Sequence, residues 1–198
     1  MSKLVNDVSI SLDGYSTGLN QSLENPFGEG VGERLHEWYT QEAEANAKVI
    51  ERMIDAGAFI MGRNMFSPGR GAWDLDWKGW WGDNPPYHGP VFILTHHERE
   101  PVEMEGGTTY HFVTDGIEAA LGRAREAAGD RNISIAGGAQ TVRQYLAAGL
   151  LDELRIHIVP VILGAGERLL DDVGDVKLEQ VESSATNLVT HITYKVVK

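Results

Sequence analysis

The residues whose types and spacing best suit chemistry are two consecutive glycines between an apolar run and a helical pattern. Ile133-Ser134-Ile135-Ala136 predicts a short buried strand, and apolar residues recur at helical spacing beyond Gly137-Gly138. Glycines let a ligand approach the backbone closely, and the free amides and dipole of a helix N-terminus favour an anion. A Gly-Gly pair also makes ordinary tight turns. The pattern predicts a phosphate cradle at Gly137-Gly138.

Two further apolar runs end in residues that suit the same ligand. Residues 59–61 lead into Gly62-Arg63, and residues 91–94 lead into Thr95-His96. Arg63 carries a fixed cation with a fork suited to phosphate, and His96 offers a second cation. A pyrophosphate on the Gly-Gly helix and a further phosphate on Arg63 and His96 describe a phosphorylated dinucleotide. The alternative for Arg63 is a surface cation, and the usual Gly-x-Gly-x-x-Gly fingerprint is absent after the first strand.

The elements that must position these residues alternate between strand and helix patterns. Apolar or alternating runs predict strands at residues 5–12, 59–61, 91–95, 110–113, 133–136, 154–158, 176–178 and 192–196. Helical spacing predicts helices over 39–54, over 117–128 and after Gly138, whereas 15–33 predicts a long mobile loop and 67–90 an irregular segment. Because the early strands are apolar and separated by helices, we expect a mainly parallel α/β sheet flanked by helices, with an antiparallel C-terminal edge, in one domain over 1–198.

Composition restricts the function classes. The formal charge of −12 argues against nucleic acid or an anionic membrane surface as a partner, since either needs a basic face. The chain has no cysteine, which excludes disulfides, thiolate metal sites and a cysteine nucleophile. The N-terminus lacks the apolar core of a signal peptide, and no apolar run is long enough to span a bilayer. We therefore expect a soluble cytoplasmic protein that binds a small molecule.

Several other polar residues have two interpretations. Asp13-Gly14 is a favoured turn dipeptide and, equally, a candidate functional carboxylate at the end of the first strand. Asp74 and Asp76 could form a carboxylate pair, but a solvated turn is favoured because no third group accompanies them. His96 and His97 point to opposite faces of an extended backbone, so no metal site is expected there. His157 lies on an alternating strand and is interpreted as solvent-facing or packed.

Motifs along nearly the whole chain give it a family resemblance. The chain resembles the dihydrofolate reductase-like family and, within it, the reductase domain of riboflavin biosynthesis, which is the C-terminal part of a bifunctional deaminase–reductase. No zinc-binding deaminase segment precedes these motifs, so a stand-alone member is expected. The matching segments are Ser11-Leu12-Asp13-Gly14, Met61-Gly62-Arg63-Asn64-Met65-Phe66, Phe92-Ile93-Leu94-Thr95-His96, Ala136-Gly137-Gly138-Ala139, Gly149-Leu150-Leu151-Asp152-Glu153-Leu154 and Pro160-Val161-Ile162-Leu163-Gly164-Ala165-Gly166.

The resemblance implies NADPH as cofactor and a homodimer as assembly. It places Gly62, Arg63, Thr95 and His96 around the adenosine and its 2′-phosphate. Along the pyrophosphate it places Gly137, Gly138, Ala139, Gln140 and Thr141. It implies a cis peptide bond between the two glycines, as in dihydrofolate reductases. Asp13 would face the substrate as an orienting group or proton relay.

Two function hypotheses follow. The first is an NADPH-dependent reductase that transfers hydride to a small pterin- or pyrimidinone-like heterocycle. The alternative is a dinucleotide- or flavin-binding protein without turnover, since no proton donor besides Asp13 is evident.

Four tryptophans lie in the irregular segment and are too large and apolar to be fully exposed to solvent. They indicate either a wall of the substrate pocket or, with slight preference, a subunit interface: Trp73, Trp77, Trp80 and Trp81.

Overall fold

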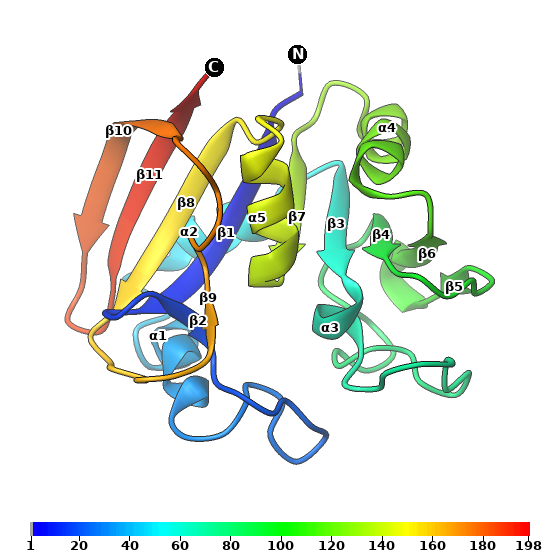
Figure 1. The fold of residues 1–198 in the computed structure, drawn as a ribbon, viewed down its shortest axis with the longest axis horizontal. Helices are drawn as coiled ribbons and strands as arrows, with labels where there is room; N and C mark the ends of the chain where they lie inside the picture. The colour runs from blue at the N-terminus through cyan, green and yellow to red at the C-terminus, as the bar shows by residue number, and fades with distance from the viewer. Residues whose placement is uncertain (1) are drawn as a thin grey trace.

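The fold is built on a nine-stranded sheet in a computed structural model that describes residues 2–198 (Figure 1). The strand order is β10-β11-β8-β1-β7-β3-β4-β6-β5, and β2 and β9 form a separate two-stranded ribbon. The strands are β1 Leu4–Ser11, β2 Tyr15–Thr17, β3 Ala58–Gly62, β4 Pro90–Leu94, β5 Val102–Glu103, β6 Thr109–Val113, β7 Ile133–Gly137, β8 Glu153–Val159, β9 Glu167–Arg168, β10 Lys177–Ala185 and β11 Thr190–Val197. The helices are α1 Trp38–Gln41, α2 Ala47–Ile54, α3 Arg63–Phe66, α4 Ile117–Ala128 and α5 Ala139–Ala147, with 3₁₀ turns at Gly32–His36 and Glu105–Gly107.

The middle of the sheet is parallel and both of its ends are antiparallel. Strands β8, β1, β7, β3, β4 and β6 run in the same direction, whereas β11 and β10 pair antiparallel at one end. This confirms the expected mainly parallel sheet with an antiparallel C-terminal edge. The short strand β5 adds a second antiparallel edge beside β6, which sequence periodicity did not predict.

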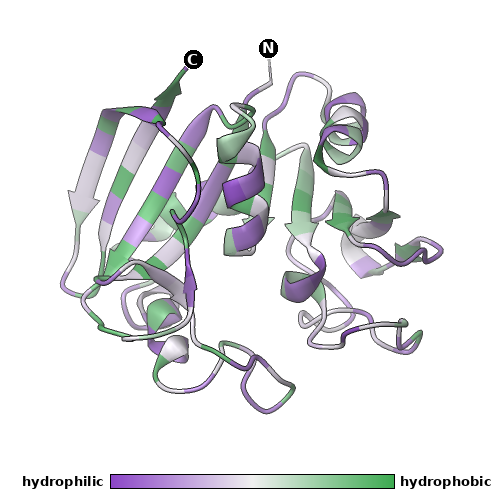
Figure 2. Cartoon of the chain, in the orientation of Figure 1, coloured by the Kyte–Doolittle hydropathy of each residue, from purple (hydrophilic) through white to green (hydrophobic). Residues whose placement is uncertain are grey.

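Alternate residues of each middle strand pack on opposite faces of the sheet. In β3, Ala58 and Ile60 join the larger core under α4 and α5, while Phe59 and Met61 join a second core with α3 and the tryptophan segment. Figure 2 shows largely hydrophobic strands β3 and β4, hydrophilic bands on β8 and β1, and a hydrophilic outer side on α5. A parallel strand covered on both faces reads as a continuous apolar run, so these strands were predictable from sequence.

The helix expected over residues 39–54 is wrong as a continuous element. It is broken into α1 and α2 by a turn, because Asn46 Nδ2 donates a hydrogen bond to the Glu42 carbonyl oxygen at 2.9 Å. The Glu42 carboxylate also accepts bonds from the Thr186 hydroxyl and the Leu188 N–H in the turn between β10 and β11. A contact between residues so distant in sequence is invisible to helical periodicity.

The segment predicted as a loop over 15–33 is largely irregular but closed on itself. The Gly18 N–H donates to the Phe27 carbonyl at 2.9 Å, and the Glu29 N–H donates to the Leu19 carbonyl at 2.7 Å. Its first residues form β2, which pairs with β9. No helix between residues 2 and 198 combines the length and the apolar character that crossing a membrane requires.

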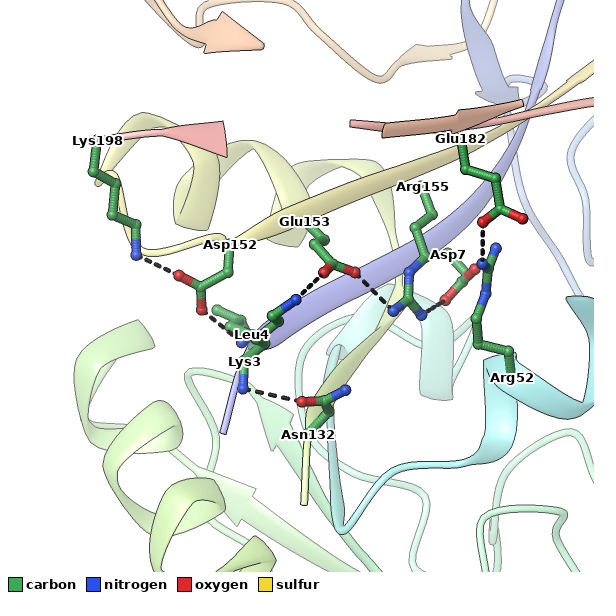
Figure 3. Close-up of polar contacts among 10 residues, drawn as sticks. All are labelled: Lys3, Leu4, Asp7, Arg52, Asn132, Asp152, Glu153, Arg155, Glu182 and Lys198. Carbon is green, nitrogen blue, oxygen red and sulfur yellow. Dashed lines mark hydrogen bonds and ion pairs between the residues drawn. The ribbon is translucent and has the colours of Figure 1, made fainter. Parts of the chain in front are cut away.

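A network of polar side chains connects β1, β8 and β11 on the face of the sheet that α2 covers. Arg155 donates hydrogen bonds to the carboxylates of Asp7 at 3.1 Å and Glu153 at 2.9 Å (Figure 3). The Arg155 and Asp7 side chains are only 8% and 3% exposed. Burial acts to raise the pKa of Asp7, but the His157 Nε2 atom 3.4 Å away and the charge of Arg155 outweigh it and lower this pKa. Asp7 is therefore a buried carboxylate.

The same layer continues through two buried histidines. His157 packs beside Trp38, as one of its two sequence interpretations anticipated, and its Nδ1 lies 2.8 Å from His191 Nδ1. His191 Nε2 contacts Asn46 Oδ1 at 2.9 Å, so this nitrogen donates and His191 Nδ1 accepts from His157. A second proton on His191 would break this bond. Burial first, then the charges of His157 and Arg52, lower the His191 pKa to about 4.

We expect stability to fall between pH 6.5 and 4 because the unfolded chain binds a proton at His191 before the folded chain does. One such group gives a slope of about 1.4 kcal/mol per pH unit, so about 2 kcal/mol is lost between pH 6.5 and 5. His36, whose pKa burial also lowers to about 4, acts in the same window. Urea unfolding at both pH values measures the loss. His191→Gln should reduce the pH dependence by about 2 kcal/mol, and an unchanged slope in this variant would contradict the assignment.

Candidate functional site

The predicted phosphate-binding residues meet at one edge of the sheet. Strands β7, β3 and β4 are parallel neighbours, so their carboxyl ends, which lead into Gly137-Gly138, Gly62-Arg63 and Thr95-His96, lie side by side. In Figure 1 this edge is at the lower end of the strands, where α5 begins. The carboxyl end of β1, with Asp13, borders β7 on the other side. Open α/β sheets bind ligands at such edges.

The Gly137-Gly138 turn joins β7 directly to α5. Its peptide bond is cis, as the family resemblance implied. Gly137 has a φ of 121°, a conformation open mainly to glycine, and a Cβ there would lie 3.3 Å from the Met65 sulfur. The Gly138 carbonyl accepts the Thr141 and Val142 N–H groups. The first amides of α5, at Ala139 and Gln140, have no partner within the helix and are therefore available to an anion.

Gly62 lets the turn after β3 touch the start of α5. A Cβ at Gly62 would lie 2.5 Å from Thr141 Oγ1 and 3.9 Å from the Gly138 nitrogen. The φ of Gly62 is −78°, so this glycine is needed for space rather than for conformation. The Thr141 side chain is buried and faces this contact. Thr141 thus supports the junction of the two turns, and Ala139, also buried, packs in the core under α5.

Arg63 presents a guanidinium with unused donors. Its Cζ atom lies over the Trp73 ring, 3.9 Å from the ring centroid, and its one hydrogen bond within residues 2–198 goes to the Ala72 carbonyl at 3.5 Å. The Nε atom is buried without a partner. Burial first, and then the charge of Arg70, lower the pKa of Arg63. The neighbouring charge of Arg70 and the unused N–H donors of Arg63 suit this place to binding an anion, although the protein as a whole is strongly acidic.

Thr95 and His96 form the turn after β4. The Thr95 hydroxyl is buried and accepts the His97 N–H at 3.1 Å, while the Thr95 N–H donates to the Val113 carbonyl. Thr95 therefore shapes the turn, and the exposed His96 side chain is the group that this turn offers a ligand.

The Asp13 side chain is hydrogen-bonded to the loop that follows β8. Its carboxylate accepts the Leu163 N–H at 3.1 Å and the Gly164 N–H at 2.7 Å. The Ser11 hydroxyl, followed by the backbone N–H groups, lowers the pKa of Asp13 to about 2. An ionised carboxylate can orient a donor group but has no proton to give at neutral pH. The catalytic role of Asp13 stays a prediction, and of its two forms the geometry favours the orienting group.

Sequence reasoning missed two apolar side chains that border Asp13. Leu12 and Ile162, which follow β1 and β8, are 66% and 69% exposed and come from segments joined by the bond from the Leu12 N–H to the Val161 carbonyl. The site edge thus has an apolar half at β1 and β8 and a cationic half at β3 and β4. The signal available in the sequence was a large apolar residue beside a glycine-containing turn, Leu12 before Asp13-Gly14 and Ile162 before Leu163-Gly164.

The tryptophan segment covers the core beneath the cationic half. Trp73, Trp77 and Trp81 pack against the cluster of Phe59, Phe66 and Tyr110. This intramolecular packing leaves the three rings partly buried, a use that neither predicted role anticipated. Asp74 accepts the Asp76 N–H at 3.0 Å, which is the solvated turn favoured from sequence.

Solved structures with a similar fold are known. A putative riboflavin biosynthesis protein from Shewanella sp. PV-4 matches with a TM-score of 0.65 and 22% identity, covering 100% of both chains. Dihydrofolate reductase from Enterococcus faecalis, in complex with NADP(H), matches with a TM-score of 0.60 and 14% identity over 99% of this chain and 97% of that one. Riboflavin biosynthesis reductase Rib7 from Saccharomyces cerevisiae gives 0.58 and 14% over 100% and 89%. These likenesses show a dihydrofolate reductase-like fold.

The family follows from the sequence match. The model of the RibD C-terminal domain matches residues 2–192, which include β1 to β10 and every residue of the candidate site. The protein is therefore a member of the RibD C-terminal domain family, with the reductase fold of that family.

Proposed function

We propose that the protein is an NADPH-dependent reductase that transfers hydride to a small pterin- or pyrimidinone-like heterocycle. The observation that carries the proposal is the close approach of the two turns that we assign to the phosphates. Gly62-Arg63 and Gly137-Gly138 lie on adjacent parallel strands, close enough that a Cβ at Gly62 would collide with Thr141. The complex of the dihydrofolate reductase neighbour with NADP(H) supports the same cofactor class.

The residues present fit this cofactor. The buried, unpartnered Nε of Arg63 and the first amides of α5 are donors without acceptors, as an anionic dinucleotide requires. Arg63 and His96 would hold the 2′-phosphate, and the start of α5 would hold the pyrophosphate. Bound NADPH supplies the hydride, and the protein places the acceptor. Leu12 and Ile162 would pack on a flat heterocycle and exclude water, while Asp13 would orient the Leu163–Gly164 backbone beside it.

Replacing the cation tests the cofactor assignment. We expect Arg63→Gln to weaken NADPH binding by about 10- to 100-fold, because charge-assisted hydrogen bonds to the 2′-phosphate are lost. NADH lacks that phosphate, so its affinity should change by less than about twofold. Calorimetric titration of both nucleotides measures this. Arg131→Gln is the matched control, since Arg131 is exposed and paired with Asp55. Absence of saturable NADPH binding to the wild-type protein at high micromolar concentration would reject the proposal.

A second candidate is a dinucleotide- or flavin-binding protein without turnover. It is favoured by one observation, the ionised state of Asp13, which leaves the predicted proton relay without a proton at neutral pH. Steady oxidation of NADPH with pterin or pyrimidinone acceptors would reject it, and loss of that oxidation in Asp13→Asn would support the role of this carboxylate. The homodimer and the cytoplasmic location stay predictions.

A further inference from the structure

We propose that Trp73 is a positioning residue that sets the preference for the 2′-phosphorylated cofactor. The inference rests on the proposed binding of NADPH and goes beyond it, because it assigns selectivity to a tryptophan that does not itself contact the ligand. Trp73 lies in the irregular segment outside the motifs that carry the family resemblance.

Trp73 touches both turns of the cationic half of the site. The face of its indole stacks on the Arg63 guanidinium, 3.9 Å from the ring centroid. Its Nε1–H donates a hydrogen bond to the His97 carbonyl oxygen at 2.9 Å, in the turn that also carries His96. One side chain therefore connects Arg63 to the turn that carries His96, the two residues assigned to the 2′-phosphate.

Aromatic contacts and hydrogen bonds in the same segment fix the position of the Trp73 indole. The Trp73 ring makes edge-to-face contacts with Phe66 and Phe112, with 5.9 Å and 5.0 Å between ring centroids. Arg99 lies 5.5 Å from the indole centroid and donates hydrogen bonds to the carbonyls of Leu75 and Trp77 in the same segment. A fixed indole restricts the rotamers of the long Arg63 side chain, whose remaining hydrogen bond is the 3.5 Å contact to Ala72.

The other tryptophans of the segment lack this connection. Trp77 donates to the Phe66 carbonyl and Trp81 packs on Tyr87, so both serve the core. Trp80 contacts the edge of Trp77. Of the four tryptophans in this segment, only Trp73 contacts both the turn after β3 and the turn after β4. Selectivity for the phosphorylated nucleotide should therefore respond to Trp73 and not to its neighbours.

The test compares the ratio of NADPH to NADH affinity among variants. Trp73→Leu removes the stacking and the N–H donor, and we expect this ratio to fall by about tenfold, with NADH affinity nearly unchanged. Trp73→Phe retains a ring beneath Arg63 and should restore most of the ratio. Trp81→Leu is the matched control, because it removes an equally large indole from the same core without touching Arg63. Calorimetry supplies the affinities, and thermal unfolding checks the fold.

The outcomes separate this inference from the proposed function. If the wild-type protein binds neither nucleotide, the proposed function and the role of Trp73 both fail. If the wild-type prefers NADPH but Trp73→Leu keeps the full preference, or Trp81→Leu loses it equally, the role of Trp73 alone is overturned.

If Trp73→Leu does not fold, Trp73→Met, with a flexible side chain that fills the gap, takes its place with the same expected loss. In the Arg63→Gln background, Trp73→Leu should lower the ratio by much less than tenfold, because its main effect acts through Arg63, and a full tenfold loss there would overturn the inference.

Discussion

Asp7→Asn is expected to lower the free energy of unfolding by about 3 kcal/mol, which is a large share of the stability of an ordinary domain. The substitution keeps the size and shape of the side chain but removes the negative charge. Arg155, 8% exposed, then keeps a positive charge in a buried layer with only Glu153 to neutralise it. His157 Nε2, 3.4 Å from the Asp7 carboxylate, loses the same partner. Urea unfolding at neutral pH measures the effect.

A surface pair gives the matched control for Asp7. Asp115 forms an ion pair of 2.7 Å with Arg123, but these side chains are 60% and 49% exposed. Asp115→Asn should therefore cost less than about 1 kcal/mol. Adding Arg155→Gln to Asp7→Asn removes the uncompensated charge, so the double variant should be more stable than the sum of the two single losses predicts. Equal losses at Asp7 and Asp115 would contradict the assignment of a buried ion pair.

Gly62→Val should separate the two turns of the candidate site and weaken the binding of NADPH and NADH alike, by about 100-fold. The reason is steric, because the first added carbon would lie 2.5 Å from Thr141 Oγ1, and the buried Thr141 has little room to move. Overpacking of this kind also costs about 1–3 kcal/mol of stability. The loss for both nucleotides distinguishes this variant from Arg63→Gln, which should affect NADPH alone.

Two further variants check the origin of that effect. Gly122 lies exposed on α4 with nothing within 4 Å of its Cβ position, so Gly122→Val should leave binding intact. Gly62→Ala combined with Thr141→Ala removes the opposing hydroxyl and should recover most of the stability that Gly62→Ala alone loses. Binding by Gly62→Val within about threefold of the wild type would show that the turns do not need their close approach.

The three strand ends were predictable because their signals are local. The apolar runs before Gly62, Thr95 and Gly137 identify buried strands, and parallel strands bring their carboxyl ends to one edge wherever they pair. The helical spacing of residues 117–128 predicted α4 for the same reason. The break between α1 and α2 was not predictable, because it combines the local bond from Asn46 to Glu42 with bonds to the Glu42 carboxylate from Thr186 and Leu188, which lie 144 and 146 residues away.

The sequence by itself determined the kind of fold, the family resemblance and which glycines and cations could bind a dinucleotide, because backbone conformation and apolar periodicity are written in neighbouring residues. Only the tertiary structure decided how those residues are used. It turned Asp13 toward a loop about 150 residues away, as a low-pKa acceptor of backbone N–H groups. It also placed Trp73 under Arg63 and against the turn after β4. Stacking and hydrogen bonding between irregular segments produce no periodic pattern in the sequence, because the contacting residues are far apart along the chain. Such contacts are therefore set only by the packing of the folded chain.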